Sequence, residues 1–210
     1  MRVSRQKSAE NRERILDAAS ALFRANGFGG IGVADIMQAA DLTHGGFYGH
    51  FASKDDLVAQ ASRRAMALAA TNWGKVVAAA PNDPYAALVD RYLSPRHRDR
   101  PDKGCAFAAL SGDAARCGKP VRAAFAAGLE PLIDVIAQAI PAHAVPARAK
   151  AVRRRKAVAA VASLVGAVIL ARAVDDVALS DEILKAARQE LLHAAGCGKR
   201  YRASRNKAAV

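Results

Sequence analysis

The sequence has 210 residues, of which 52% are hydrophobic and 24% are charged, and its formal net charge is +13. The apolar content suffices for a folded core, which excludes a disordered or collagen-like chain, and the length suits one or two domains. The cysteines Cys105, Cys117 and Cys197 show no metal-ligand spacing and are too few for a disulfide framework, which favours reduced thiols in a cytoplasmic protein. The basic charge favours a polyanionic partner.

Three segments bear on targeting signals, membrane spans and tails. Residues 1–15 are polar and basic without an apolar stretch, so no signal peptide is expected. The apolar run Ala157–Ala171 follows four basic residues, but it is shorter than the roughly 20 residues that a membrane span needs, and it predicts a fully buried helix. Residues 199–210 are basic without apolar periodicity and predict a disordered tail.

Apolar residues recur at helical spacing throughout the chain, and no segment alternates as a strand does, so the predicted fold class is all-α. Ser8 is expected to cap a first helix that ends at Asn26-Gly27. Polar and proline-rich residues after Ser94 predict a loop over Arg96–Gly104, and Pro131 should kink or split the helix around it. The further helices are expected at Val33–Ala40, Thr43–Tyr48, Ser53–Ala80, Tyr85–Leu93, Cys105–Arg116, Pro120–Ile140, Pro146–Arg172 and Ser180–Ala195.

The segment Gly27–Gly32 matches the G-x-G-x-x-G pattern of dinucleotide-binding loops. That pattern binds nucleotides only between a strand and a helix, whereas here an amphipathic helix precedes it. The glycines are therefore interpreted as a permissive connection between helices.

Two short helices joined by a tight turn, Val33–Ala40 and Thr43–Tyr48, form a predicted helix-turn-helix unit. Polar side chains at the start of the second helix are suited to phosphates and base edges, and two glycines there permit close approach to DNA. A lysine in the next helix's first turn opposes the helix dipole, which a facing phosphate would explain. The predicted DNA-binding residues are Thr43, His44, Gly45, Gly46, Tyr48, His50 and Lys54.

The order and spacing of residues over about 8–65 resemble the TetR/AcrR family of bacterial transcriptional regulators. The segments that carry this resemblance are Ile15–Ala19, Phe23, Gly27-Phe28, Val33–Ala40, Thr43–Phe51 and Ser53–Leu57. The resemblance implies a TetR-like all-helical homodimer that binds a palindromic DNA operator, usually as a repressor, and is released by a small-molecule effector. His44 and Gly46 depart from the lysine and threonine frequent in the family, which affects the operator sequence that would be read.

The resemblance also implies a division into a helix-turn-helix DNA-binding domain at 1–52 and a ligand-binding and dimerisation domain at 53–198, connected by helix 53–80, before the tail 199–210. The two C-terminal helices are expected to form the dimer interface, where small residues repeat every four positions and permit close helix approach. The predicted interface residues are Ala159, Ser163, Ala167, Ile183, Leu184 and Leu191.

Aromatic residues of the C-terminal half could line a ligand pocket or simply form the core. The ligand-binding candidates are Trp73, Tyr92, Phe107 and Phe125, together with Cys105. Because Cys105 begins a predicted helix, a redox- or electrophile-sensing role is an alternative to its being a small buried residue.

No catalytic, cofactor or metal-binding motif is present: the histidines lack metal spacing, and nucleophile elbows, P-loops and HExxH are absent from the sequence. Two alternatives from other classes remain at this point. An all-helical enzyme would turn over a substrate without DNA affinity, and a helical protein-interaction module would show no salt-dependent affinity for duplex DNA. Within the main interpretation, an activator remains an alternative to a repressor.

Overall fold

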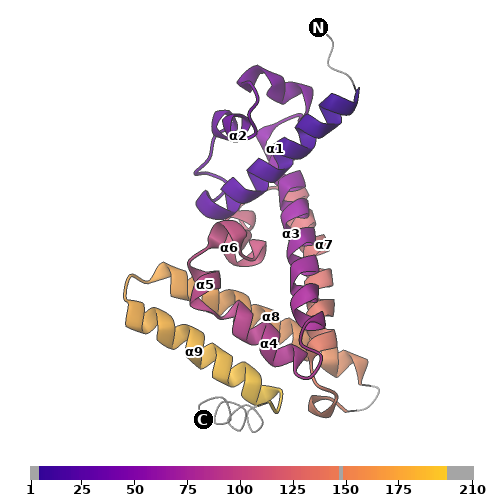
Figure 1. The fold of residues 1–210 in the computed structure, drawn as a ribbon, viewed down its shortest axis with the longest axis vertical. Helices are drawn as coiled ribbons and strands as arrows, with labels where there is room; N and C mark the ends of the chain where they lie inside the picture. The colour runs from indigo at the N-terminus through magenta and orange to yellow at the C-terminus, as the bar shows by residue number, and fades with distance from the viewer. Residues whose placement is uncertain (1–4, 147–148, 198–210) are drawn as a thin grey trace. The chain divides into compact units, whose positions relative to one another are not determined.

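The computed structural model describes residues 5–146 and 149–197, and every regular element in these ranges is a helix (Figure 1). The predicted tail 199–210 lies outside the described residues. The elements in chain order are α1 (Arg5–Asn26), α2 (Val33–Ala39), the 3₁₀ helix η1 (His44–Gly49), α3 (Lys54–Ala78), α4 (Pro84–Tyr92), α5 (Pro95–Arg98), the 3₁₀ helix η2 (Pro101–Lys103), α6 (Ala106–Ala114), α7 (Lys119–Ala139), the 3₁₀ helix η3 (Ala142–Ala144), α8 (Lys150–Ala173) and α9 (Val177–Ala194).

The helices form two compact units. The first contains residues up to Ala69 together with Arg100–Leu129, so η2, α6 and the first part of α7 pack with the N-terminal helices. The second contains Ala70–Asp99 together with residues from Glu130 onward. Long helices α3 and α7 each contribute to both units.

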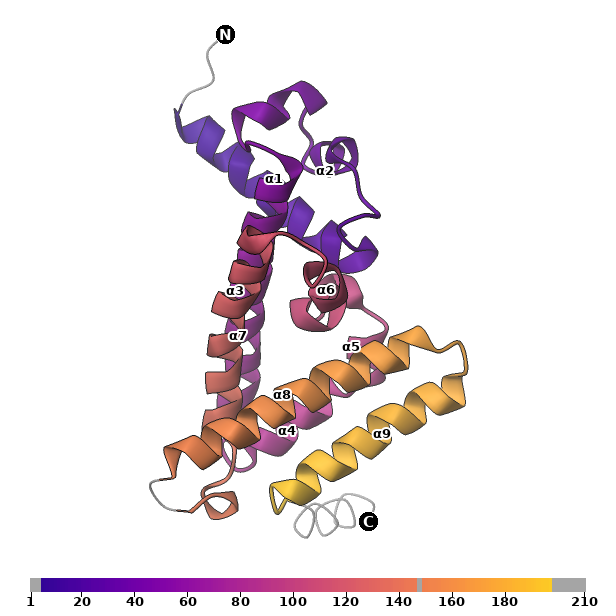
Figure 2. The ribbon, with the colours of Figure 1, turned by 180° about the vertical axis from the view of Figure 1, so that it is seen from behind.

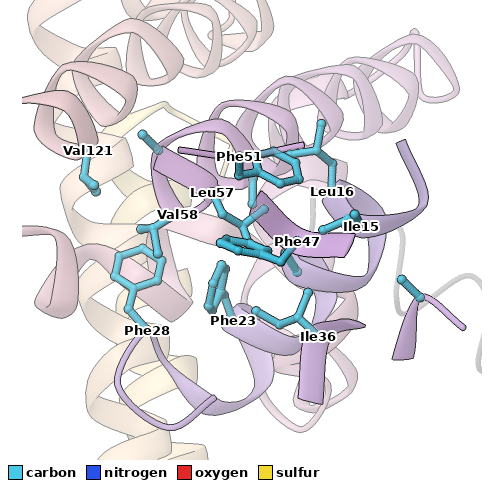
Figure 3. Packing of buried hydrophobic residues seen from close by; sticks show 14 of the residues in the cluster. Ile15, Leu16, Phe23, Phe28, Ile36, Phe47, Phe51, Leu57, Val58 and Val121 are labelled. Atoms are coloured by element: carbon cyan, nitrogen blue, oxygen red, sulfur yellow. The ribbon is translucent and has the colours of Figure 1, made fainter. Parts of the chain in front are cut away.

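One apolar core holds the first unit together. Aromatic rings from α1, η1 and the segment before α3 meet in it, and Phe47 is stacked on Phe51 with ring centroids 5.8 Å apart (Figure 3). Phe23 meets Phe28 edge to face at 5.4 Å. Side chains of α6 and α7, including Leu110 and Val121, complete the same cluster. The helix-turn-helix elements therefore share their core with residues far along the chain.

Local residues set the helix ends in this unit. Helix α1 ends as predicted at Gly27, whose φ of +76° is readily adopted only by glycine. The predicted cap at Ser8 is wrong, because α1 already begins at Arg5. At the start of α3, Ser53 Oγ accepts a hydrogen bond from the Asp56 N–H (3.1 Å), and Asp56 Oδ2 accepts one from the Ala52 N–H (3.2 Å). This arrangement satisfies two amides near the helix start.

In the second unit, α8 and α9 lie side by side in both ribbon views, joined by a short turn (Figures 1 and 2). Helix α9 begins at Val177, three residues before the predicted start, because Asp176 Oδ1 accepts hydrogen bonds from the N–H groups of Ala178 and Leu179 (2.8 and 3.1 Å). Ser180 is instead buried inside the helix, where its hydroxyl donates to the Ala171 carbonyl at 2.6 Å.

The structure corrects the expected loop after Ser94 and the expected split at Pro131. The segment expected to be a loop over Arg96–Gly104 contains α5 and η2, because Ser94 Oγ accepts a hydrogen bond from the His97 N–H (3.2 Å) and starts a helical turn. Pro131 lies inside α7 without splitting it. Its ring is on the exposed side of the helix, where the missing amide hydrogen bond is least costly.

Helix α8 is long and apolar enough to cross a membrane by length and composition alone, and 39% of its most apolar window is buried. The prediction of a fully buried helix is therefore wrong on one face. Leu164 and Val168 are buried, whereas Val158, Ile169 and Leu170 are exposed by 43%, 38% and 58%. An apolar helix face of this kind needs a covering surface.

Candidate nucleic-acid interface

The 3₁₀ helix η1 carries most of the predicted contact residues. Thr43 is its N-cap residue, with extended backbone angles, but its side chain makes no capping hydrogen bond. The backbone closes the first turn instead, through a bond from the Gly46 N–H to the Thr43 carbonyl (3.0 Å). Thr43 is exposed, and its hydroxyl is not committed to capping the helix.

Side chains of η1 divide sharply between core and surface. Phe47 is fully buried, whereas its neighbour Tyr48 is 73% exposed, and the two rings meet edge to face at 5.1 Å. Thr43, His44 and Gly45 are also exposed. The buried Phe47 ring thus anchors η1 to the core. The exposed side of η1 is polar, and the Tyr48 ring is its one bulky apolar group.

The glycines of η1 are not required by packing within the chain. A Cβ atom added at Gly45 would meet nothing within 4 Å, and one at Gly46 would lie in ordinary contact, 3.7 Å from Met37 Cε. Glycine costs about 1 kcal/mol relative to alanine in a helix. The absence of a side chain at Gly45 therefore suits an external surface that approaches closely.

Two further predicted contacts follow η1 directly. His50 is the C-cap residue, and its N–H bonds to the Phe47 carbonyl at 2.9 Å. Lys54 is the first residue of α3 and is partly exposed, one residue after the capping Ser53. Tyr48, His50 and Lys54 thus lie within seven residues of chain, at the end of η1 and the start of α3, where hydroxyl, imidazole and ammonium groups can all contact phosphate oxygens.

Charged groups fix α1 against α3 behind this surface. The guanidinium of Arg64 bonds to Asp17 Oδ1 at 2.6 Å and also to the Glu13 carboxylate. The hydrogen bond to Asp17 is the largest cause of the raised pKa of Arg64. These contacts join helices 47 and 51 residues apart in sequence, which no local pattern reveals.

The residues proposed to bind a ligand fall into two groups. In the second unit, Trp73 and Tyr92 pack with ring centroids 4.8 Å apart, and both contact His97, which sequence reasoning missed. The His97 ring nitrogen Nδ1 lies 2.7 Å from the Tyr92 carbonyl, and burial lowers the pKa of this imidazole to about 4. These rings are buried, so their described arrangement is that of a core.

The other ligand-binding candidates lie in the first unit. Phe107 meets Phe125 edge to face at 5.7 Å. Cys105 is the N-cap residue of α6 and is only 1% exposed. Its neighbourhood includes Arg24, whose pKa is lowered by burial, an effect that Asp102 and Cys105 oppose. The five candidates therefore do not form one cluster.

A groove of about 570 Å³ runs along α8 and α9 in the second unit, and its floor is built of small residues. Ala159 and Ser163 are exposed there and Ile183 is partly exposed, while Ala167 and Leu191 line the groove although they are largely buried. Leu184 is 3% exposed because it packs inside the chain, so its proposed place in a dimer interface is corrected to the core of the unit.

Comparison with known proteins agrees with this arrangement. The family described as "Bacterial regulatory proteins, tetR family" matches residues 15–61. The HTH-type transcriptional regulator AcrR of Shigella flexneri is 37% identical over 59 residues, which cover 28% of this chain and 27% of AcrR. The match to AcrR thus spans about a quarter of that relative. The family match over residues 15–61 contains α2, η1 and the start of α3.

Solved structures match over most of the chain. E. coli NemR in its reduced form gives a TM-score of 0.71 at 21% identity, covering 88% of this chain and 97% of NemR. A TetR-family regulator from Cytophaga hutchinsonii gives 0.70 at 22% identity, covering 93% and 98%. A TetR regulator from Chloroflexus aurantiacus gives 0.64 at 26% identity, covering 91% and 95%.

The N-terminal sequence match and the all-helical fold point to the same group of proteins. Residues 15–61 therefore belong to the tetR family of bacterial regulatory proteins, and the described chain has the all-helical fold of TetR-family transcriptional regulators.

Proposed function

We propose that the protein is a ligand-responsive repressor that binds a palindromic operator as a homodimer and is released by a small-molecule inducer. The observation that carries the proposal is the surface formed by η1 and the start of α3. Tyr48 is 73% exposed there next to a fully buried Phe47, and the nearby Gly45 has open space where a side chain would stand. Proteins of this family regulate transcription rather than catalyse reactions.

DNA binding by this surface is testable with labelled duplex from the region upstream of the gene. Fluorescence anisotropy at several salt concentrations, with scrambled duplex as competitor, should give nanomolar affinity and a clear preference for the operator. Tyr48→Ala and Lys54→Ala should each weaken binding, and Lys54→Ala should reduce the salt slope by about one. Equal affinity for scrambled duplex, lost steeply with salt, would show that only the basic charge attracts DNA.

The homodimer is supported by the uncovered apolar face of α8 and α9. Leu170 is 58% exposed and lies beside the groove that contains Ala159 and Ser163. A second copy of the chain would cover this face, and two-fold symmetry would place two recognition surfaces on successive major grooves, about 34–36 Å apart. Sedimentation should show a dimer for the natural protein and a monomer for Leu170→Glu.

Cys105 supports a second candidate function, in which the released state follows oxidation or electrophile attack on the thiol. The observation in its favour is that Cys105, the buried N-cap residue of α6, interacts electrostatically with the Arg24 guanidinium in the unit that contains the helix-turn-helix elements. The test is operator release by hypochlorite or N-ethylmaleimide, compared between the natural protein and Cys105→Ser. Equal release from both would exclude this function.

A further inference from the structure

A chain of polar side chains connects α1 to the segment just before Lys54. Arg12 on α1 donates a hydrogen bond to Gln60 Oε1 on α3. Gln60 Nε2 in turn donates to Asp56 Oδ1 at 2.8 Å. The other oxygen of Asp56 accepts the Ala52 N–H at 3.2 Å. Three side chains thus link the middle of the DNA-binding unit to the turn that precedes the first residue of α3.

The same arginine also contacts the aromatic rings beneath η1. Its guanidinium carbon lies 5.1 Å from the centroid of the Phe51 ring. Phe51 is stacked on Phe47, and Phe47 meets the exposed Tyr48 ring. A planar guanidinium can stack on a ring and donate in its own plane at once, whereas an ammonium group cannot.

Arg12 differs from an ordinary surface cation because its guanidinium contacts other groups of the protein. Its side chain is 37% exposed, and it contacts Gln60, the Phe51 ring and, at 4.0 Å, Glu13. Glu13 is itself bonded to Arg64. The guanidinium is therefore engaged with the protein on both its face and its edge.

We propose that Arg12 is a positioning residue for DNA binding that acts through Gln60 and Phe51. It holds residues 50–54 so that the side chains of Tyr48, His50 and Lys54 keep the spacing that neighbouring phosphates require. This inference rests on the proposed DNA-binding surface and extends it to a residue that does not itself contact DNA.

Substitutions on both helices test this role by operator affinity. Arg12→Ala and Gln60→Leu should each weaken binding about tenfold, equivalent to about 1.4 kcal/mol, and the double variant should be no weaker than either. The salt slope should stay unchanged, because no phosphate contact is lost. Arg12→Lys keeps the charge but should not restore affinity. Arg14→Ala is the matched control on α1, since Arg14 pairs with Asp41, whose side chain is 97% exposed.

A second measurement uses no DNA and so separates this inference from the proposed function. In the free protein, hydrogen exchange at the amides of Ala52 and Asp56 should be about tenfold faster in Arg12→Ala and Gln60→Leu, and unchanged in Arg14→Ala. Unchanged exchange in the first two variants would overturn the positioning role whatever the DNA result. A salt slope reduced by about one in Arg12→Ala, with normal binding by Gln60→Leu, would show a direct phosphate contact instead.

Discussion

The guanidinium of Arg24 holds a single backbone carbonyl, that of Asp102, with two hydrogen bonds from Nε and Nη2 at 2.9 and 2.7 Å. Its Nη1 donates to Ser20 Oγ at 2.6 Å. Arg24 lies near the end of α1, whereas Asp102 lies in η2, 78 residues further along the chain. The contact therefore ties the supporting helix of the helix-turn-helix to the segment that leads into α6.

Loss of this contact should destabilise the protein. Arg24→Ala is expected to lower the free energy of unfolding by about 2–3 kcal/mol, because hydrogen bonds from a charged, partly buried donor are among the strong ones. Arg24→Lys should recover only part of this, since one ammonium cannot reproduce the two-pronged geometry. Urea unfolding measures both. Arg100→Ala is the control, because Arg100 pairs with the Asp102 side chain at the surface, with 53% and 37% of the two side chains exposed. Equal losses for Arg24→Ala and Arg100→Ala would contradict the assignment.

This contact also illustrates what the sequence could not predict. Residues 96–104 contain one proline and many charges, a composition that predicts a loop, and the partner in α1 is too distant in sequence for any local pattern to indicate it. Helix periods and end signals such as Asn26-Gly27 and Ser53 are local and were predictive. The prediction at Ser8 was wrong because a residue type that often caps helices does not start a helix where the residues before it also favour helix.

The surface of η1 was predicted for similar reasons, since alternation between core Phe47 and exposed Tyr48 follows from local spacing. The sequence did not predict the 3₁₀ form of η1 or the hydrogen bonds that link Arg12 to Gln60, because both depend on packing against α1 and α3. Leu184 and its exposed neighbours on α9 fit the same helical periodicity, so the sequence does not distinguish them. Which of them is buried depends on how α8 packs against α9.

Gly45 should separate folding from DNA binding. Because a Cβ atom there would meet nothing within 4 Å, Gly45→Ala should leave stability unchanged or raise it by up to about 1 kcal/mol. Operator affinity should fall about tenfold or more, since an added methyl at a close contact costs about 1–3 kcal/mol. Gly74→Ala in α3 is a matched control: it also has open space around it and lies in the second unit. Undiminished operator affinity of Gly45→Ala would mean that DNA does not approach this glycine.

Gly128 permits a close approach of α7 to α3 within the first unit. A Cβ atom at this position would lie 2.6 Å from both Cβ and Sδ of Met66, and Met66 is 1% exposed. Gly128→Ala should therefore lower the free energy of unfolding by about 1–3 kcal/mol, despite the better helix propensity of alanine. In Met66→Ala the close contacts with Cγ and Sδ are gone but the Cβ contact at 2.6 Å stays, so the same substitution should cost less without becoming stabilising. Urea unfolding of the four proteins gives the coupling energy, and strict additivity would show that the two residues do not meet.

His97 should make stability depend on pH. Burial lowers the pKa of its imidazole to about 4, the carbonyl of Tyr92 opposes this shift, and the charges of Arg172 and Arg91 add to it. The unfolded chain takes up the proton near pH 6.5, whereas the folded protein does not until about pH 4. The contribution of neutral His97 is thus fully present above pH 6.5 and is lost as the pH falls toward 4.

The expected size is about 2 kcal/mol at pH 5, from roughly 1.4 kcal/mol for each unit of separation. His97→Gln keeps a donor for the Tyr92 carbonyl but cannot titrate, so its free energy of unfolding should fall less between pH 7 and pH 5 than that of the natural protein. Urea unfolding at pH 7, 6 and 5 measures this, with His193→Gln as a control at an exposed histidine. Parallel pH curves for the natural protein and His97→Gln would mean that folding does not change proton uptake at this imidazole.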